Sequence, residues 1–103
     1  MRDVLPEIHR WRDDGKQVVL ATLIKAVGSS PRPLGAKLAI SSDGAMAGSV
    51  SGGCVEGAVL EEAREVFATG KPKRLRYGIS DEQAWSVGLT CGGEIEVLVE
   101  RLI

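Results

Sequence analysis

The chain has 103 residues and a mass of 10.9 kDa, which suits one domain and leaves no room for two. Its hydrophobic content of 44% and mean hydropathy of +0.03 supply one core and exclude a disordered chain. Thirteen Lys and Arg against fourteen Asp and Glu give a net charge of −1, without the basic excess typical of nucleic-acid-binding proteins, so we expect no nucleic-acid partner.

The N-terminal part of the sequence predicts a helix followed by a strand. Val4, Ile8 and Trp11 recur at helical spacing among charged residues, and Gly15 follows them. This pattern is typical of a short amphipathic helix that ends at a glycine. Residues 17–26 are mostly aliphatic or β-branched and are bounded by turn-forming residues, which predicts a buried strand.

A shaped loop and a hairpin are predicted next. Residues 27–35 contain two Pro and two Gly, a composition that excludes a helix or a central strand. Residues 37–41 and 45–47 flank the turn sequence Ser-Asp-Gly, which indicates a short hairpin. The hairpin brings two further strands to the predicted sheet.

The second half of the chain predicts one helix and two strands. Apolar residues recur at helical spacing over 55–67, and Gly70 marks the end of this helix. Residues 73–79 alternate as in a half-exposed strand, and 80–93 form a second irregular loop. Residues 94–102 alternate charged and aliphatic positions over their first half, which predicts a strand with one wet face.

These elements predict an α+β fold in a single small domain spanning residues 1–103. We expect a mixed or antiparallel sheet of about five strands with two helices packed on it. Two Cys do not form a disulfide framework, and the N-terminus lacks the apolar core of a signal peptide. The longest apolar stretch, 18–27, is shorter than the ~20 residues that span a bilayer. We therefore expect a cytoplasmic protein without membrane association.

The Gly-rich segment before the second helix is the first candidate site. With Gly53 as the N-cap, Cys54 would be the first helical residue and Glu56 the third. Exposed amides at a helix N-terminus favour both an anion and a thiolate. A carboxylate at Glu56 would weaken that anion site. The alternative is a capping arrangement in which Cys54 is a small buried residue.

Two further Gly-bearing loops contain chemistry of the same kind. Arg32 lies between two prolines, and an arginine in a stiff loop suits recognition of a phosphate or carboxylate, although a solvated surface arginine is the alternative. Cys91 precedes Gly92-Gly93, mirroring the Gly-Gly-Cys sequence at Cys54. We predict that Cys54 and Cys91 lie on one face, close enough to share a ligand or form a disulfide. His9, in the first helix, is expected at the surface.

Several of these motifs, in this order, resemble those of the XdhC/CoxI family. The resemblance rests on residues 28–37 (GSSPRPLGAK), 48–56 (GSVSGGCVE), 77–78 (YG), 80–82 (SDE) and 88–93 (GLTCGG). Members of this family are accessory factors that mature molybdenum hydroxylases such as xanthine dehydrogenase and aerobic carbon monoxide dehydrogenase. Longer members add a C-terminal Rossmann domain, which we do not expect within these 103 residues.

The resemblance implies a role and a set of residues for it. The chain would bind the molybdenum cofactor (molybdopterin) transiently, assist its sulfuration and insertion, and act as a non-catalytic chaperone. Cys54 and Cys91 would be the sulfur-bearing or molybdenum-facing thiols. The resemblance also implies that the cofactor, including its anionic phosphate, would be bound by Ser29, Ser30, Arg32, Gly52, Gly53 and Gly92.

The implied partners are a molybdenum hydroxylase apoenzyme and a cysteine desulfurase. Because so small a domain encloses little of a large cofactor, we also expect a homodimer or a separate Rossmann-domain partner chain. Two alternatives stay open. One is a sulfurtransferase in which Cys54 cycles through a persulfide that Cys91 resolves, and the other is a small docking or regulatory subunit for the Rossmann-domain partner.

Overall fold

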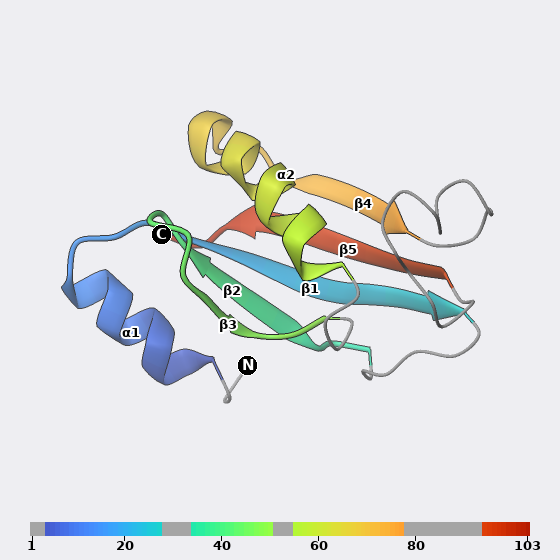
Figure 1. The fold of residues 1–103 in the computed structure, drawn as a ribbon, viewed down its shortest axis with the longest axis horizontal. Helices are drawn as coiled ribbons and strands as arrows, with labels where there is room; N and C mark the ends of the chain where they lie inside the picture. The colour runs from blue at the N-terminus through green and yellow to red at the C-terminus, as the bar shows by residue number, and fades with distance from the viewer. Residues whose placement is uncertain (1–3, 28–33, 51–54, 78–93) are drawn as a thin grey trace.

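The computed structural model describes residues 4–27, 34–50, 55–77 and 94–103. Two helices and five strands follow one another along these ranges (Figure 1). In chain order they are α1 (Leu5–Asp13), β1 (Val18–Val27), β2 (Lys37–Ser41), β3 (Met46–Gly48), α2 (Glu56–Thr69), β4 (Lys73–Tyr77) and β5 (Glu94–Arg101).

The five described strands form one sheet in the order β3-β2-β1-β5-β4. Every pair of neighbours is antiparallel. This arrangement confirms the predicted α+β fold and settles the choice between a mixed and an antiparallel sheet. The ten-residue strand β1 lies at the centre, because its aliphatic residues can be buried on both faces.

Alternation along β1 divides the core into two layers. Val19, Ala21 and Leu23 face α2, whose own buried side chains include Val59 and Val66. Their neighbours along β1 face the other side, since successive side chains in a strand point to opposite faces. There Val18 and Leu20 pack with Val4, Ile8 and Trp11 of the α1 region. The two predicted helices therefore cover opposite faces of the sheet.

Both helices end as the sequence predicts, at a glycine in the left-handed region. After α1, Gly15 has φ of 78° and donates to the Arg12 carbonyl at 3.0 Å, while Lys16 donates to the Trp11 carbonyl at 2.9 Å. These two bonds form a Schellman motif. After α2, Gly70 has φ of 72° and donates to the Val66 carbonyl.

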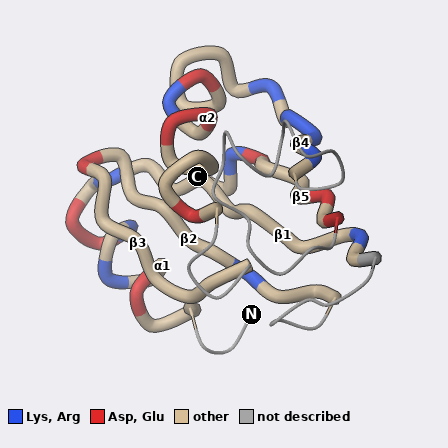
Figure 2. Tube along the Cα trace, turned by 45° about the vertical axis from the view of Figure 1, so that its right-hand side comes forward, with Lys and Arg blue, Asp and Glu red and all other residues tan. Residues whose placement is uncertain are grey.

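Charged side chains join α2 to the edge strand β4. Lys73 of β4 pairs with Glu62 and Glu65 of α2. Figure 2 shows the acidic positions on α2 and the basic positions along β4. Neither of the two described helices is long and apolar enough to cross a membrane.

Candidate functional site

The predicted site residues lie outside the described residues. They fall in the segments 28–33, 51–54 and 78–93, so their predicted roles stay predictions. These residues are Ser29, Ser30, Arg32, Gly52, Gly53, Cys54, Cys91 and Gly92. The structure does describe the residues from which each segment leaves the fold and to which it returns.

The described strand ends next to these three segments lie at one end of the sheet (Figure 1). The last residue of β1, Val27, pairs with the first residue of β5, Glu94. Tyr77, which ends β4, pairs with the next residue of β5. Lys37 begins β2 and Gly48 ends β3, and antiparallel pairing places both at this same end of their strands. Residues far apart in the sequence are thus anchored to a common end of the sheet.

This common end of the sheet has a step, because the strands do not all end at the same level. Thr22 is the last residue of β1 that pairs with β2, whereas pairing with β5 continues to Val27. A bulge between Leu23 and Lys25 shortens this stretch, whose partners on β5 run over four residues, from Leu98 to Glu94. Four residues of a strand span about 13 Å, since each contributes about 3.3 Å. The anchor of segment 51–54 at Gly48 is therefore set back along the sheet from the anchors of segment 78–93. A shared site would need the segments to cross this step.

The carboxylate of Glu56 connects the two sides of segment 51–54. Its Oε2 atom accepts a hydrogen bond from the Ser49 hydroxyl at 2.6 Å and another from the Val50 amide at 3.0 Å. Ser49 is itself held to β2, where its amide donates to the Lys37 carbonyl at 2.9 Å. The chain before and after the Gly-rich segment is thereby tied to the sheet.

The predicted start of the second helix is wrong by two residues. The helix begins at Glu56, with Val55 as the N-cap, so Cys54 is not its first residue and Glu56 is not its third. The physical reason is that Val55 is buried in the core and that Glu56 bonds to Ser49 and Val50 instead of capping the helix. A carboxylate on the first helical residue stabilises the positive end of the helix and repels a second anion there.

An ion pair between an exposed arginine and a buried carboxylate lies beside the anchors of segment 78–93. The side chain of Glu94 is 6% exposed, and its Oε1 accepts a hydrogen bond from Arg76 Nε at 2.9 Å. Arg76 Nε also lies 3.6 Å from an oxygen of Glu96, and the bond to Glu94 raises the pKa of the Arg76 guanidinium. The predicted wet face of the last strand is therefore wrong at Glu94. The alternating charges of 73–77 and 94–96 carried the signal for this pairing.

The structure describes two further titratable residues, Tyr77 and His9. Tyr77 is buried in the core that faces α2, and this burial, followed by the nearby charge of Glu62, raises its pKa to about 12. His9 lies exposed on α1, as predicted. Among the described residues no group of three or more His, Cys, Asp or Glu could hold a metal ion.

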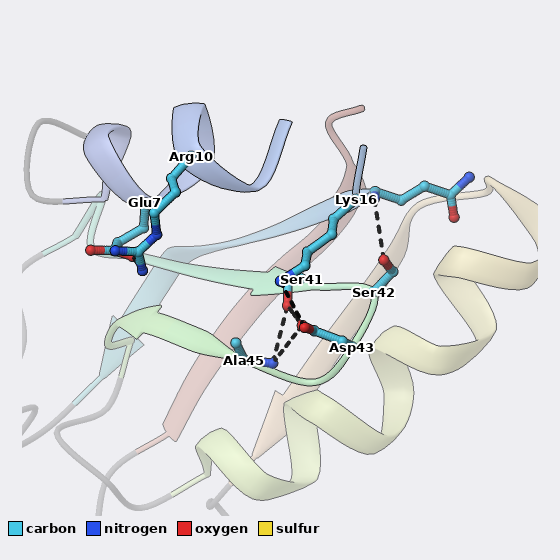
Figure 3. Close-up of polar contacts among 8 residues, drawn as sticks. Glu7, Arg10, Lys16, Ser41, Ser42, Asp43 and Ala45 are labelled. Carbon is cyan, nitrogen blue, oxygen red and sulfur yellow. Dashed lines mark hydrogen bonds and ion pairs between the residues drawn. The ribbon is translucent and has the colours of Figure 1, made fainter. Parts of the chain in front are cut away.

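A hollow of about 270 Å³ lies at the opposite end of the sheet, between α2 and the β2–β3 turn. Figure 3 shows the polar contacts of this turn. Asp43 pairs with Lys16 at 2.8 Å and with Ser41, and these bonds lower its pKa to about 2. The Ser42 hydroxyl accepts a hydrogen bond from the backbone amide of Gln17 at 3.2 Å. These contacts stabilise the turn that forms one wall of the hollow.

Comparison with known proteins identifies relatives for most of the chain. The sequence model of the XdhC and CoxI family matches residues 11–78, a range that contains Arg32 and Cys54 but not Cys91. The chain is 42% identical over 89 residues to a protein of Escherichia coli strain K12 named molybdenum cofactor insertion chaperone PaoD. It is 33% identical over 94 residues to a protein of Bacillus subtilis strain 168 that is named as a probable xanthine dehydrogenase subunit.

These similarities cover nearly all of this chain and a small part of its relatives. The two alignments span 85% and 87% of the chain but 27% and 28% of the relatives. A crystal structure from Bacillus halodurans, described as a xanthine dehydrogenase, superposes with a TM-score of 0.79 at 32% identity. The matched region covers 95% of this chain and 30% of the chain in that crystal structure. The fold is thus one that also occurs inside a much longer protein.

Proposed function

Because the chain belongs to the XdhC and CoxI family, we propose that it is an accessory factor for the maturation of a molybdenum hydroxylase. The observation that carries this proposal is the 42% identity to a protein named a molybdenum cofactor insertion chaperone. In this role the chain binds the molybdenum cofactor transiently, supports its sulfuration, and delivers it to the apoenzyme. It acts as a chaperone without a reaction of its own.

The residues proposed to hold the cofactor are those of the three segments anchored at one end of the sheet. Cys54 and Cys91 supply the thiolates, which suit a thiophilic metal better than the carboxylates of the described residues. The cofactor itself supplies the molybdenum centre and the pterin that the mature hydroxylase uses. Ser29, Ser30 and Arg32, together with Gly52, Gly53 and Gly92, bind its anionic and polar groups. The common anchoring of these segments supports this assignment.

The proposed partners follow from the size of the domain and from the cargo. An apoenzyme receives the cofactor, and a cysteine desulfurase provides the sulfur. The chain spans just over a quarter of the length of the relatives it matches. We therefore propose that a second copy of the chain, or a separate Rossmann-domain chain, completes the enclosure of the cofactor, and that the assembly works in the cytoplasm.

The test is anaerobic binding of purified molybdenum cofactor to the wild-type chain and to Cys54→Ser. We expect the wild type to bind and Cys54→Ser to bind at least about tenfold more weakly, because the substitution removes a soft metal ligand. Cys91→Ser shows whether the second thiol contributes. If the wild-type chain binds no cofactor, the carrier function is wrong, and a docking role on a partner chain takes its place.

A further inference from the structure

A lysine side chain is held across the sheet at the step in its common end. Lys37 begins β2, and the residue that pairs with it on β1 is Thr22. The Lys37 Nζ atom donates a hydrogen bond to the Thr22 hydroxyl at 3.0 Å, and both residues are partly buried. An ammonium group held in this way has less rotamer freedom to lose when it binds a ligand than a solvated lysine has.

The pair formed by Lys37 and Thr22 retains hydrogen-bond donors and an unneutralised charge. One donor of the ammonium is used by Thr22, and the others remain. The Thr22 oxygen accepts this bond, so its own proton can be donated to another group. None of the ion pairs formed within the described part of the chain includes Lys37. The pair therefore combines donors with a positive charge, which is what an anion requires.

The row of side chains to which this pair belongs contains cations and no acid. Directly opposed residues on antiparallel strands have their side chains on the same face of the sheet. One such row crosses β2, β1, β5 and β4 and consists of Lys37, Thr22, Leu98 and Arg74. The acids of the neighbouring rows, Glu96 and Glu100, lie on β5, which is separated from β2 by β1. Glu96 also lies 3.6 Å from Arg76 Nε, so Arg76 partly neutralises it.

The pair lies at the margin of the layer that α1 covers. Leu20 and Ala39, two residues back along β1 and two residues further along β2, belong to the core beneath α1. Thr22 and Lys37 are on the same face but remain partly accessible. At such a boundary the attraction between an ammonium and an anion is stronger than in open solvent, because the effective dielectric constant is lower.

We propose that Lys37 and Thr22 form a binding site for a phosphate group on the face of the sheet where α1 packs. A phosphate has several acceptor oxygens, so it can accept hydrogen bonds from the ammonium and from the hydroxyl at once. Lys37 supplies the charge, and Thr22 both orients the ammonium and donates its own proton. Under the proposed function, on which this inference rests, the group is the phosphate of the molybdenum cofactor.

The experiment compares Lys37→Gln in the full chain with Lys71→Gln as the matched control. Lys71 is exposed and lies just before β4, at the opposite end of the sheet. Affinity is measured anaerobically for purified molybdenum cofactor, both intact and after enzymatic removal of its phosphate, on samples shown to be folded. We expect Lys37→Gln to bind the intact cofactor about tenfold more weakly than wild type, since it loses hydrogen bonds between charged groups. Without the phosphate, the two proteins should bind within about twofold of each other, and the control should match wild type with both ligands.

Two results with the cofactor would overturn the proposal. Equal weakening of both ligands by Lys37→Gln would show that Lys37 does not act on the phosphate, and unchanged affinity for the intact cofactor would show that the ammonium makes no contact with it. Should Lys37→Gln not fold, Thr22→Val replaces it, because valine suits a strand and removes only the hydroxyl. We expect this variant to weaken binding of the intact cofactor alone, by about threefold.

A second measurement separates this proposal from the function on which it rests. If the wild-type chain binds no cofactor, the proposed function fails, and titration with inorganic phosphate followed by NMR decides on the site. Shifts of the Thr22 and Lys37 backbone amide signals in wild type and in Lys71→Gln, but not in Lys37→Gln, support the phosphate site. No shift of these signals in wild type, or equal shifts in all three proteins, refutes it.

Discussion

At the scale of single residues, Gly48 is the position where backbone geometry and packing demand the same residue. Its positive φ strains any residue that has a Cβ, and the space that a Cβ would fill is taken by the Lys37 carbonyl and the Val4 side chain. Gly44 has a similar φ of +91°, but nothing lies within 4 Å of its Cβ position. Comparing the two separates conformational strain from steric overlap.

We predict that Gly48→Ala lowers the free energy of unfolding by about 3 kcal/mol or more, since overlap with fixed backbone adds to the ~1–2 kcal/mol of a left-handed non-glycine residue. Gly44→Ala should cost only about 1–2 kcal/mol, from the strain alone. Gly57→Ala, in the helix and without neighbours at its Cβ position, should stabilise by about 0.5–1 kcal/mol. Urea unfolding of the three variants measures these values, and equal costs at Gly48 and Gly44 would contradict the packing argument.

At the scale of elements, the β2–β3 turn is stabilised by a carboxylate whose partners come from two parts of the chain. Asp43 bonds to Lys16, which follows α1, and to Ser41, at the end of β2. These bonds lower its pKa from 3.8 to about 2 in the folded protein. The folded state therefore binds fewer protons here than the unfolded chain between these two values. Stability from the charge is present above about pH 4 and is lost as the pH falls towards 2.

Asp43→Asn should accordingly destabilise the protein at neutral pH and make little difference in strong acid. The amide has the shape of the carboxyl group but carries no charge at any pH. In strong acid Asp43 of the wild type is protonated and has also lost its negative charge, so the two proteins should then be about equally stable. The measurement is the difference in urea midpoint between wild type and variant at about pH 6, 4 and 2. A difference that stays constant over this range would show that shape, and not charge, stabilises the turn.

Most elements could be predicted from the sequence because local chemistry determines them. The helical spacing up to Trp11 and the glycine at Gly15 define α1, and the Ser-Asp-Gly sequence defines the hairpin turn. The start of α2 could not be found in this way. It depends on hydrogen bonds that Glu56 makes with residues six and seven positions earlier, and such bonds have no signature in a helix-capping pattern.

The same distinction between local patterns and long-range contacts applies to the candidate site. The residue types in the three Gly-bearing segments indicate chemistry, but their positions in space depend on contacts that no local pattern encodes. The burial of Glu94 is an example, because it requires Arg76 from a strand that follows another helix. The alternation within β5 alone predicts a solvated carboxylate at this position, since it contains no information about the neighbouring strand.

At the scale of the whole molecule, two groups of contacts lie at opposite ends of the sheet. The core has one layer on each face of the sheet, with α2 packed on one side and α1 on the other. The turn network of Asp43 lies at one end of the sheet, and the anchors of the three Gly-bearing segments lie at the other. The mutual position of Cys54 and Cys91 therefore depends on the whole sheet, because their anchors belong to different strands.

We predict that mild oxidation of the dilute chain forms an intramolecular disulfide between Cys54 and Cys91. The bond requires the Cα atoms to come within about 7 Å, so its formation would show that the two segments cross the step between Gly48 and the start of β5. Mass spectrometry of the intact chain and of its peptides under non-reducing conditions detects the crosslink, and Cys91→Ser is the control. If oxidation yields only dimers linked between chains, the two thiols do not meet within one molecule, and the proposed shared site needs a second copy to complete it.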